Sequence, residues 1–359
     1  MLIQHEKLVE ISTSILKAAG APADKARLVS EHLVEANLKG HDSHGIGMVS
    51  SYVRSMLAGL VDVNKDAELI NDAGAVLSFD GGTGFGRVVG MQAIDTGIER
   101  AKDHGVCVVA LGNASHLGRI GVFGERCSEA GMVSMHYVNV VGHDPMVVAY
   151  GGRDRRFVTN PFCCTVPRDD GNHVILDMAT TTVAAGKVRV AMMKGVEVPD
   201  ESLVDASGNP TNDPNAMWKD GGAMRPFGKH KGYGLMVMCE LLGGALGGLF
   251  TMQPGNPRLG NTINNMLSVI IDPKAVGDRD AFEQEVSAMI DYIYESEPAE
   301  GLDGVLIPGD PERESKKRLL QEGINVDDNS WQDFLTCLLY TSDAADEGLG
   351  VDLGGRRII

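Results

Sequence analysis

The sequence lacks an excess of positive charge. Its 359 residues include 32 Lys and Arg against 49 Asp and Glu, which gives a formal net charge of −17. Nucleic acids and anionic membranes bind basic surfaces, so we expect neither as a partner. An anionic small molecule remains possible, because its site needs only one or two local cations.

Cysteine pairs at metal-binding spacing and long apolar runs are also missing. The six cysteines form no C-x-x-C pair and mostly lie in apolar runs, so we predict buried hydrophobic residues and no disulfides. No stretch reaches transmembrane length without polar interruption. Residues 1–20 have an amphipathic helical pattern and not that of a signal peptide, so we expect a cytoplasmic protein.

The two common nucleotide-binding fingerprints are absent. The glycine cluster at 81–86 (GGTGFG) fails the G-x-G-x-x-G spacing, because Arg87 and Val89 stand where glycine is required. Lys229 and Lys231 lack the surroundings of a P-loop. Any nucleotide site is therefore of neither the Rossmann nor the P-loop type, and the glycine cluster predicts a turn that enters a helix.

Hydrophobic residues make up 43% of the chain and charged residues 23%, which allows a packed core. Residues 1–60 predict helices. Strands are predicted at 75–79, 106–111, 133–138, 157–166, 173–176 and 266–271, and helices at 88–102, 122–130, 182–193, 230–249, 281–294 and 311–322. Since 230–249 is apolar nearly all round, it predicts a buried central helix.

These patterns predict a mixed α+β fold with two domains. Both chain ends, residues 1–74 and 276–336, would form a helical domain, and residues 75–275 an α+β domain. The segment 337–359 reads like translated sequencing-adapter sequence, and we predict a poorly packed, non-native tail there.

Two short segments place a histidine beside a serine among glycines: residues 40–45 (GHDSHG) and 115–121 (SHLGRIG). Histidine exchanges a proton near neutral pH, and glycine lets the backbone approach a ligand closely. We predict that the two segments form two walls of one catalytic site. Its candidate catalytic residues are His44, His116 and Ser43.

Two alternatives remain open from the residues alone. A metal-dependent hydrolase or lyase could use His41, His44 and His116, although no further ligand stands at a recognisable zinc spacing and we predict no metal. Neither Ser43 nor Ser115 lies in a G-x-S-x-G motif, which disfavours a serine hydrolase. A non-catalytic binding protein is the other alternative.

Six segments in this order, GHDSHGIGM, SHLGRIG, TNPF, LDMAT, HKGYG and IPGDPE, resemble the malate and L-lactate dehydrogenases that lack a Rossmann fold. The resemblance covers the chain to about residue 334, and its nearest branch resembles hydroxycarboxylate dehydrogenase B. It implies a homodimeric oxidoreductase that uses NAD or NADP and a 2-hydroxy or 2-oxo acid. It also implies a mostly antiparallel mixed sheet beside a helical domain built from both termini.

The resemblance also assigns residues. His44 matches the proton donor of some members, and His116 that of others. Positions that match cofactor contacts are His44, Arg119, Ile120, Gly121, Leu176, Asp177, Met178, Ala179, Thr180, His230, Lys231, Asn264, Gly309, Asp310, Pro311 and Glu312.

The expected substrate contacts depart from the wider family at one position. Met48 stands where many members have an arginine that holds the substrate carboxylate. Arg54 and Arg119 are the candidates to replace it, because a guanidinium can bind a carboxylate through two hydrogen bonds. Thr159 and Asn160 complete the predicted substrate contacts.

Overall fold

The computed structural model describes residues 1–327, 331–334, 336 and 337. Cys337 is buried, and the rest of the predicted tail lies outside the described residues. The chain divides into two units. A terminal unit combines Met1–Asn64 with the chain from Glu312 onward, and a central unit comprises Lys65–Pro311.

The terminal unit is mainly helical. Its elements are β1 (Leu2–Ile3), α1 (His5–Ala18), α2 (Ala23–Leu38), η1 (Asp42–His44), η2 (Ile46–Met48), α3 (Val49–Leu57) and β14 (Ile324–Asn325), with most of α11 (Asp310–Glu322). Apolar residues of α1 recur at helical spacing, and Leu8 and Ile15 are fully buried. β1 pairs with β14 antiparallel, which joins the two ends of the described chain.

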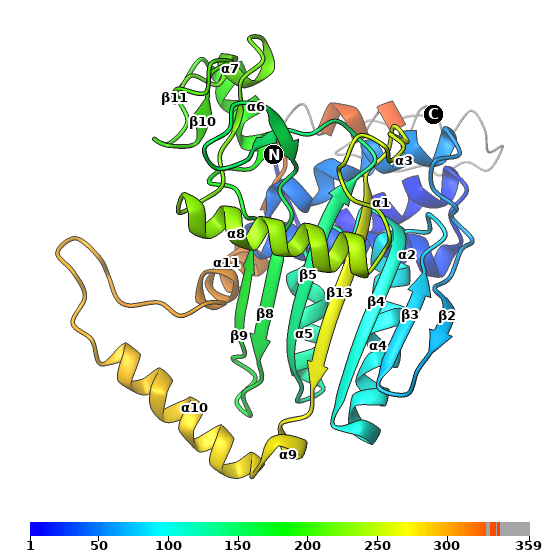
Figure 1. The fold of residues 1–359 in the computed structure, drawn as a ribbon, viewed down its shortest axis with the longest axis vertical. Coiled ribbons are helices and arrows are strands. Elements are labelled where there is room, and N and C mark those ends of the chain that lie inside the picture. Colours follow the sequence, from blue (N-terminus) through cyan, green and yellow to red (C-terminus); the bar gives the residue numbers. More distant parts are fainter. Residues whose placement is uncertain (328–330, 335, 338–359) are drawn as a thin grey trace. The chain divides into compact units, whose positions relative to one another are not determined.

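The central unit contains a seven-stranded sheet in the order β2-β3-β4-β13-β5-β8-β9 (Figure 1). The strands are β2 (Glu68–Asp72), β3 (Val76–Asp80), β4 (Val106–Ser115), β13 (Ile263–Ile271), β5 (Val133–Val141), β8 (Phe162–Val166) and β9 (Val174–Met178). Only β3 and β4 pair in parallel. The result is a mixed sheet with antiparallel pairs in the majority.

Helices cover both faces of this sheet (Figure 1). On one face lie α4 (Gly86–His104) and α5 (Gly121–Glu129), and their apolar residues form the main core with β3, β4 and β13. On the other face α8 (His230–Cys239) continues into the π-helical turn η3 (Glu240–Leu246), which packs on β5 and β13. β5 and β13 therefore lie between two helical layers.

A second, five-stranded sheet belongs to the same unit. Its strands are short and have the order β11 (Pro210–Thr211), β10 (Leu203–Val204), β12 (Ala223–Met224), β6 (Val147–Val148), β7 (Arg155–Phe157). The remaining helices are α6 (Ala185–Lys194), α7 (Asn215–Trp218), α9 (Pro273–Val276) and α10 (Arg279–Tyr294). The predicted strand 157–166 is therefore two strands in different sheets, because residues 158–161 turn between them.

The prediction of a helix at 230–249 that is buried all round is wrong. Met238, Leu241 and Leu246 are 44%, 49% and 63% exposed, and glycines face the sheet on the other side.

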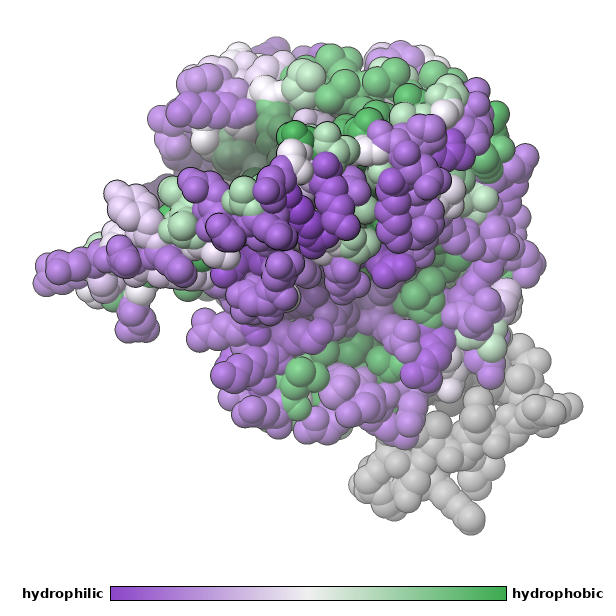
Figure 2. All heavy atoms as spheres, turned by 90° about the horizontal axis from the view of Figure 1, so that it is seen from below, coloured by the Kyte–Doolittle hydropathy of each residue, from purple (hydrophilic) through white to green (hydrophobic). Residues whose placement is uncertain are grey.

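Figure 2 shows a face of the molecule that is mostly hydrophilic, with hydrophobic side chains gathered in its upper part. None of the described helices is both long and apolar enough to span a membrane.

The boundary between the two units also differs from the predicted domains. Residues 276–311 lie in the central unit, not with the helical chain ends. Two contacts account for this: Arg279 reaches Asp169, and the Ile175 amide donates to the Pro308 carbonyl at 3.0 Å. The chain returns to the terminal unit only at Glu312.

Candidate active site

The GHDSHG loop of the terminal unit is held by one buried amide, that of Asn37 on α2. Asn37 Nδ2 donates to Asp42 Oδ1 at 2.6 Å, and Asn37 Oδ1 accepts the Ile46 amide at 2.7 Å. A Cβ at Gly45 would lie 2.2 Å from Asn37 Oδ1, so this position requires glycine. The loop around His44 is therefore fixed at both of its ends.

His44 is half-buried within this loop, and its Nδ1 lies 3.1 Å from the Ser43 hydroxyl oxygen. A serine hydroxyl can donate to a neutral imidazole nitrogen and accept from a protonated one. Ser43 can therefore hold the ring in both charge states. Met48 is half-buried and Arg54, on α3, is exposed in the same unit.

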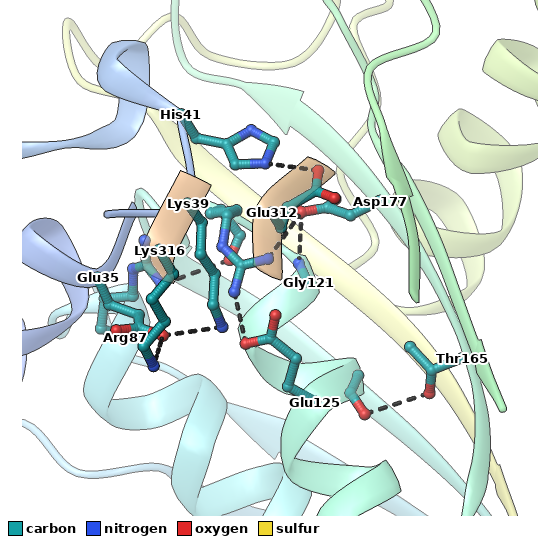
Figure 3. Close-up of polar contacts among 12 residues, drawn as sticks. Glu35, Lys39, His41, Arg87, Gly121, Glu125, Thr165, Asp177, Glu312 and Lys316 are labelled. Atoms are coloured by element: carbon teal, nitrogen blue, oxygen red, sulfur yellow. Dashed lines mark hydrogen bonds and ion pairs between the residues drawn. The ribbon is translucent and has the colours of Figure 1, made fainter. Parts of the chain in front are cut away.

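His41 has a different partner. Its Nε2 lies 3.1 Å from Glu312 Oε1, the first residue of α11 that belongs to the terminal unit (Figure 3). This contact joins the GHDSHG loop to the PGDPE segment. Among the described residues, no group of three His, Cys, Asp or Glu side chains could hold a metal ion.

His116 follows β4 in the central unit and is half-buried. The next amide, that of Leu117, donates to Asn264 Oδ1 at 2.8 Å. Ser115 Oγ donates to the Thr83 carbonyl at 2.8 Å, which gives this serine a structural bond. A Cβ at Gly86 would lie 2.2 Å from the Ser115 carbonyl oxygen, so α4 can begin against this loop only with glycine.

Arg119 is buried against two protein carboxylates, Glu125 and Asp177, which are labelled in Figure 3. Its side chain is 2% exposed, and its Nη2 donates to Glu125 Oε2 at 2.5 Å. Its Nη1 lies 3.6 Å from Asp177 Oδ2, the atom that also accepts the first amide of α5, from Gly121, at 2.8 Å. Burial lowers the pKa of Arg119, but Glu125 and Asp177 raise it by more. The guanidinium that was predicted to hold a substrate carboxylate already neutralises two carboxylates of the protein.

Thr180 joins the LDMAT and TNPF segments. Its hydroxyl donates to the Thr159 and Asn160 carbonyls at 2.6 and 2.9 Å. Asn160 is fully buried and has a positive φ of 32°. Thr159, Leu176 and Met178 are half-buried, and Ala179 is exposed, which leaves this edge open to a ligand.

The HKGYG and PGDPE segments meet the same region of the central unit. The Phe227 amide, just before α8, donates to the Thr180 carbonyl, and Pro308 contacts Ile175 as described above. His230 and Lys231 are exposed at the start of α8. Asp310 Oδ2 accepts the Tyr294 hydroxyl and the Ile307 amide, which fixes the turn at Gly309.

The central unit thus brings together five of the six motifs along its sheet, by the contacts of Leu117, Gly121, Thr180, Phe227 and Pro308. His44, Ser43, Met48, Arg54 and Glu312 lie in the terminal unit. The convergence of His44 with His116 stays a prediction, since the two residues belong to different units.

Several supporting residues were missed at the level of sequence. Asn37, Asn139 and Glu240 lie in apolar or helical runs, and no spacing distinguishes them from surface residues. His136 was missed for the same reason. It is fully buried between the Ser134 and Ser268 hydroxyls, and burial lowers its pKa to about 3. It is therefore a neutral structural histidine.

The cysteines carry no disulfide. All six are free, and five of them are buried. Burial raises the pKa of the Cys127 and Cys239 thiols to about 12, which leaves them unreactive at neutral pH.

Comparison with known proteins agrees with this arrangement. The family model of malate/L-lactate dehydrogenase matches residues 3–335. The chain is 44% identical to hydroxycarboxylate dehydrogenase B of Escherichia coli O157:H7, with 89% of this chain and 88% of the relative covered. It is 38% identical to the L-lactate dehydrogenase of Cupriavidus necator, with 90% and 93% covered.

Solved structures show the same fold. An Escherichia coli chain provisionally assigned as a malate/lactate dehydrogenase superposes with a TM-score of 0.89 at 40% identity, with 95% of each chain covered. Sulfolactate dehydrogenase from Methanocaldococcus jannaschii superposes with a TM-score of 0.84 at 31% identity, with 95% and 98% covered. The chain is an enzyme of the malate/L-lactate dehydrogenase family.

Proposed function

We propose that this enzyme transfers hydride between NAD(P) and a 2-hydroxy or 2-oxo carboxylic acid, with His44 as the proton donor and acceptor. Family membership supports the reaction class. The observation that carries the choice of His44 is its contact with Ser43 in a loop that Asn37 fixes. His116 orients the substrate in this proposal, or replaces His44 as the acid.

The proton transfer follows from the Ser43–His44 pair. In the reducing direction protonated His44 donates to the forming alkoxide, and in the oxidising direction neutral His44 accepts the hydroxyl proton. Because Nδ1 of His44 is hydrogen-bonded to Ser43, Nε2 is the ring nitrogen that exchanges a proton with the substrate in this proposal. Nδ1 keeps its proton and donates to the Ser43 oxygen in both charge states, while Nε2 loses and regains the exchanged proton, so the ring need not turn during the reaction.

The central unit offers a donor set that fits a dinucleotide. His230 and Lys231 are exposed at the N-terminal end of α8, where backbone amides and the helix dipole favour an anion. Ala179 is exposed next to the Thr180 bonds that hold this edge. These residues would hold the pyrophosphate, and bound nicotinamide supplies or accepts the hydride. Nothing in this set selects NAD over NADP.

We assign the substrate carboxylate to Arg54 in preference to Arg119. Arg54 is exposed and shares the terminal unit with His44, whereas the Arg119 side chain is 2% exposed and paired. In this proposal Met48, in the same unit, adds an apolar side chain to the substrate contacts.

Turnover of NADH and NADPH with a panel of 2-oxo acids tests the reaction. The panel should include pyruvate, oxaloacetate, sulfopyruvate and phenylpyruvate. We expect reduction of at least one acid, and activity that survives a chelator. Binding of NAD(P)H without turnover of any acid would instead favour a non-catalytic binding protein. Activity without nicotinamide that a chelator abolishes would favour the metal-dependent alternative.

Two histidine variants test the acid. H44Q should lower kcat by roughly a hundredfold or more, with the Kd of NAD(P)H within about twofold of wild type, because general acid catalysis contributes on the order of 10²–10⁴ in rate. H116Q is the matched comparison. Normal kcat in H44Q together with a collapse in H116Q would transfer the role to His116.

We also propose a homodimer. The α8–η3 segment and α10 expose large apolar side chains, among them Leu246 at 63% and Tyr292 at 70%. Monomers seldom expose many such residues together, and a second copy could cover them. Mass photometry at nanomolar concentration should give twice the chain mass; a single-chain mass across the micromolar range would refute the proposal.

A further inference from the structure

Glu240 is a carboxylate buried inside the central unit, at the first residue of the π-helical turn η3. It is 6% exposed. Its Oε2 accepts Asn160 Nδ2 at 2.6 Å, and its Oε1 accepts the Met252 amide at 2.6 Å and Asn139 Nδ2 at 3.5 Å. All three partners are donors, so they match an ionised carboxylate. Turns of π-helix within a helix are often found at functional sites.

Glycines bring η3 close enough for these bonds. A Cβ at Gly243 would lie 2.6 Å from the Tyr137 carbonyl oxygen, and one at Gly244 would lie 2.3 Å from Asn139 Nδ2. Burial raises the pKa of Glu240, and the hydrogen bonds from its three donors oppose that shift. Protonation would aim an O–H group at a donor, so the hydrogen-bond pattern itself selects the charged form.

The first arm of this network fixes the TNPF turn. Asn160 Oδ1 accepts the Val140 amide at 3.1 Å, while its Nδ2 donates to Glu240 and to the Met236 carbonyl. A donor (the Val140 amide) on one side and acceptors (the Glu240 carboxylate and the Met236 carbonyl) on the other determine which way the Asn160 amide faces. The Asn160 backbone has a positive φ, which few residues adopt without support. Glu240 therefore helps to hold a strained turn next to Thr159.

The second arm leads to the SHLGRIG loop. Asn139 lies against Glu240, and the Asn139 carbonyl accepts Asn264 Nδ2 at 2.9 Å. Asn264 Oδ1 in turn accepts the amide of Leu117, the residue after His116. The carboxylate is thus linked through two asparagines to the backbone beside a candidate catalytic histidine.

We propose that Glu240 is a positioning residue, which holds the Thr159–Asn160 turn and the His116–Leu117 backbone in the geometry that the reaction requires. The kinetic part of this inference rests on the proposed hydride transfer. Glu240 contacts no substrate in this role and acts through Asn160 and Asn139. Its isosteric amide is the sharpest perturbation, because E240Q preserves volume and changes only one acceptor into a donor.

In E240Q the glutamine oxygen can still accept the Met252 amide, so its NH₂ group faces Asn160 Nδ2, donor against donor at 2.6 Å. Asn160 must then turn away and lose its bond to Val140. We expect kcat to fall about 10- to 100-fold, as small displacements of reacting groups do, with the KM for NAD(P)H within about twofold. E283Q is the matched control: Glu283 on α10 is 8% exposed and shares none of these partners, and its variant should keep kcat.

A second substitution, N160D, should lower kcat in the wild-type protein but raise it in E240Q. N160D alone places two carboxylates together and should lower kcat. In E240Q/N160D the new aspartate accepts from the glutamine NH₂ and from Val140, so kcat should recover several-fold over E240Q. All rates are measured at least 10 °C below the Tm of each variant, so that a purely structural role would leave kcat per folded molecule unchanged. Equal kcat in E240Q and E283Q, or no recovery in the double variant, would overturn the proposal.

Failure of the proposed function gives a different result. If the wild type reduces no 2-oxo acid, hydride transfer is refuted, and crystal structures of wild type and E240Q decide the positioning role. Loss of the Asn160–Val140 bond in E240Q would support that role, and an unchanged Thr159–Asn160 turn would overturn it.

Discussion

Replacement of Arg119 by methionine separates two roles for that residue, and they predict opposite results. In the structure its guanidinium bonds Glu125 at 2.5 Å and lies 3.6 Å from Asp177. The Glu125 and Asp177 side chains are only 16% and 9% exposed. R119M would therefore remove the Arg119 cation from two carboxylates that have little access to water.

The magnitude follows from that burial. Removal of one partner from a buried ion pair costs about 3–5 kcal/mol of unfolding free energy, because the remaining charge is uncompensated. For a unit of this size such a loss lowers Tm by about 6–20 °C. R119M/E125Q also removes the charge of Glu125 and should recover about 1–2 kcal/mol of unfolding free energy relative to R119M.

Urea denaturation followed by circular dichroism measures these differences, with an unchanged m-value as the check on the comparison. The matched control is R54M, which removes an exposed arginine and should change stability by no more than about 0.5 kcal/mol. We expect R54M, and not R119M, to raise the KM for the 2-oxo acid at least tenfold. An R119M protein of wild-type stability with a greatly raised KM would refute this account and restore Arg119 as the carboxylate ligand.

Three further predictions concern packing and pH. Burial raises the pKa of Glu35, but Lys39 and Lys316 lower it by more, from 4.5 to about 2. The depressed pKa stabilises the fold above pH 4.5, and this stabilisation is lost as the pH falls towards 2. In urea titrations K316M should therefore lower the free energy of unfolding by on the order of 1–2 kcal/mol at pH 7 and by almost nothing at pH 2. A loss of equal size at both pH values would contradict the ion pairing. G86A should lower the free energy of unfolding by about 1–3 kcal/mol, because the new Cβ would overlap the Ser115 carbonyl. Gly186 also lies in a helix, but a Cβ added there meets no atom within 4 Å, so G186A should leave the Tm unchanged or raise it in thermal melts. The His136 ring, with its pKa lowered to about 3, should show constant NMR shifts from about pH 8 to pH 5, and a transition near pH 6.5 would show that it is solvated.

Hydrophobic periodicity predicted the long elements of the central sheet and its covering helices. α4 has an apolar stripe, and β13 is apolar at 266–271 except for Ser268, so both stand out from their surroundings. The five-stranded sheet could not be predicted in this way. Four of its strands are two residues long, too short for any period to be visible.

The error at α8–η3 has a different physical cause. The segment carries apolar residues on all sides, and composition alone cannot distinguish burial by the protein's own sheet from exposure. Gly243 and Gly244 allow close approach to β5 on one side, while Leu246 remains exposed on the other. Only the topology reveals which side the sheet covers.

The order of the motifs predicted the segments of the candidate site, but not the residues that hold them. Asn37 acts on an amide nine residues away, and Glu240 on an asparagine 80 residues away. Contacts at such separations leave no spacing pattern in the sequence. A glutamate or an asparagine inside a helical run is ordinarily solvated, so nothing in the sequence marks either residue as a buried support of a loop.

The candidate loops are held by the same kind of contact, a buried asparagine side chain. Asn37, Asn160 and Asn264 each accept a backbone amide through Oδ1, and each donates through Nδ2 to an oxygen of another segment. A side-chain amide accepts at one atom and donates from another, so one asparagine can join two segments at a fixed distance. A glycine-rich phosphate loop achieves rigidity through backbone turns that leave a spacing fingerprint. Here buried asparagines position the candidate loops within each unit, and these loops are therefore fixed without the glycine fingerprint that a Rossmann-type dinucleotide enzyme shows.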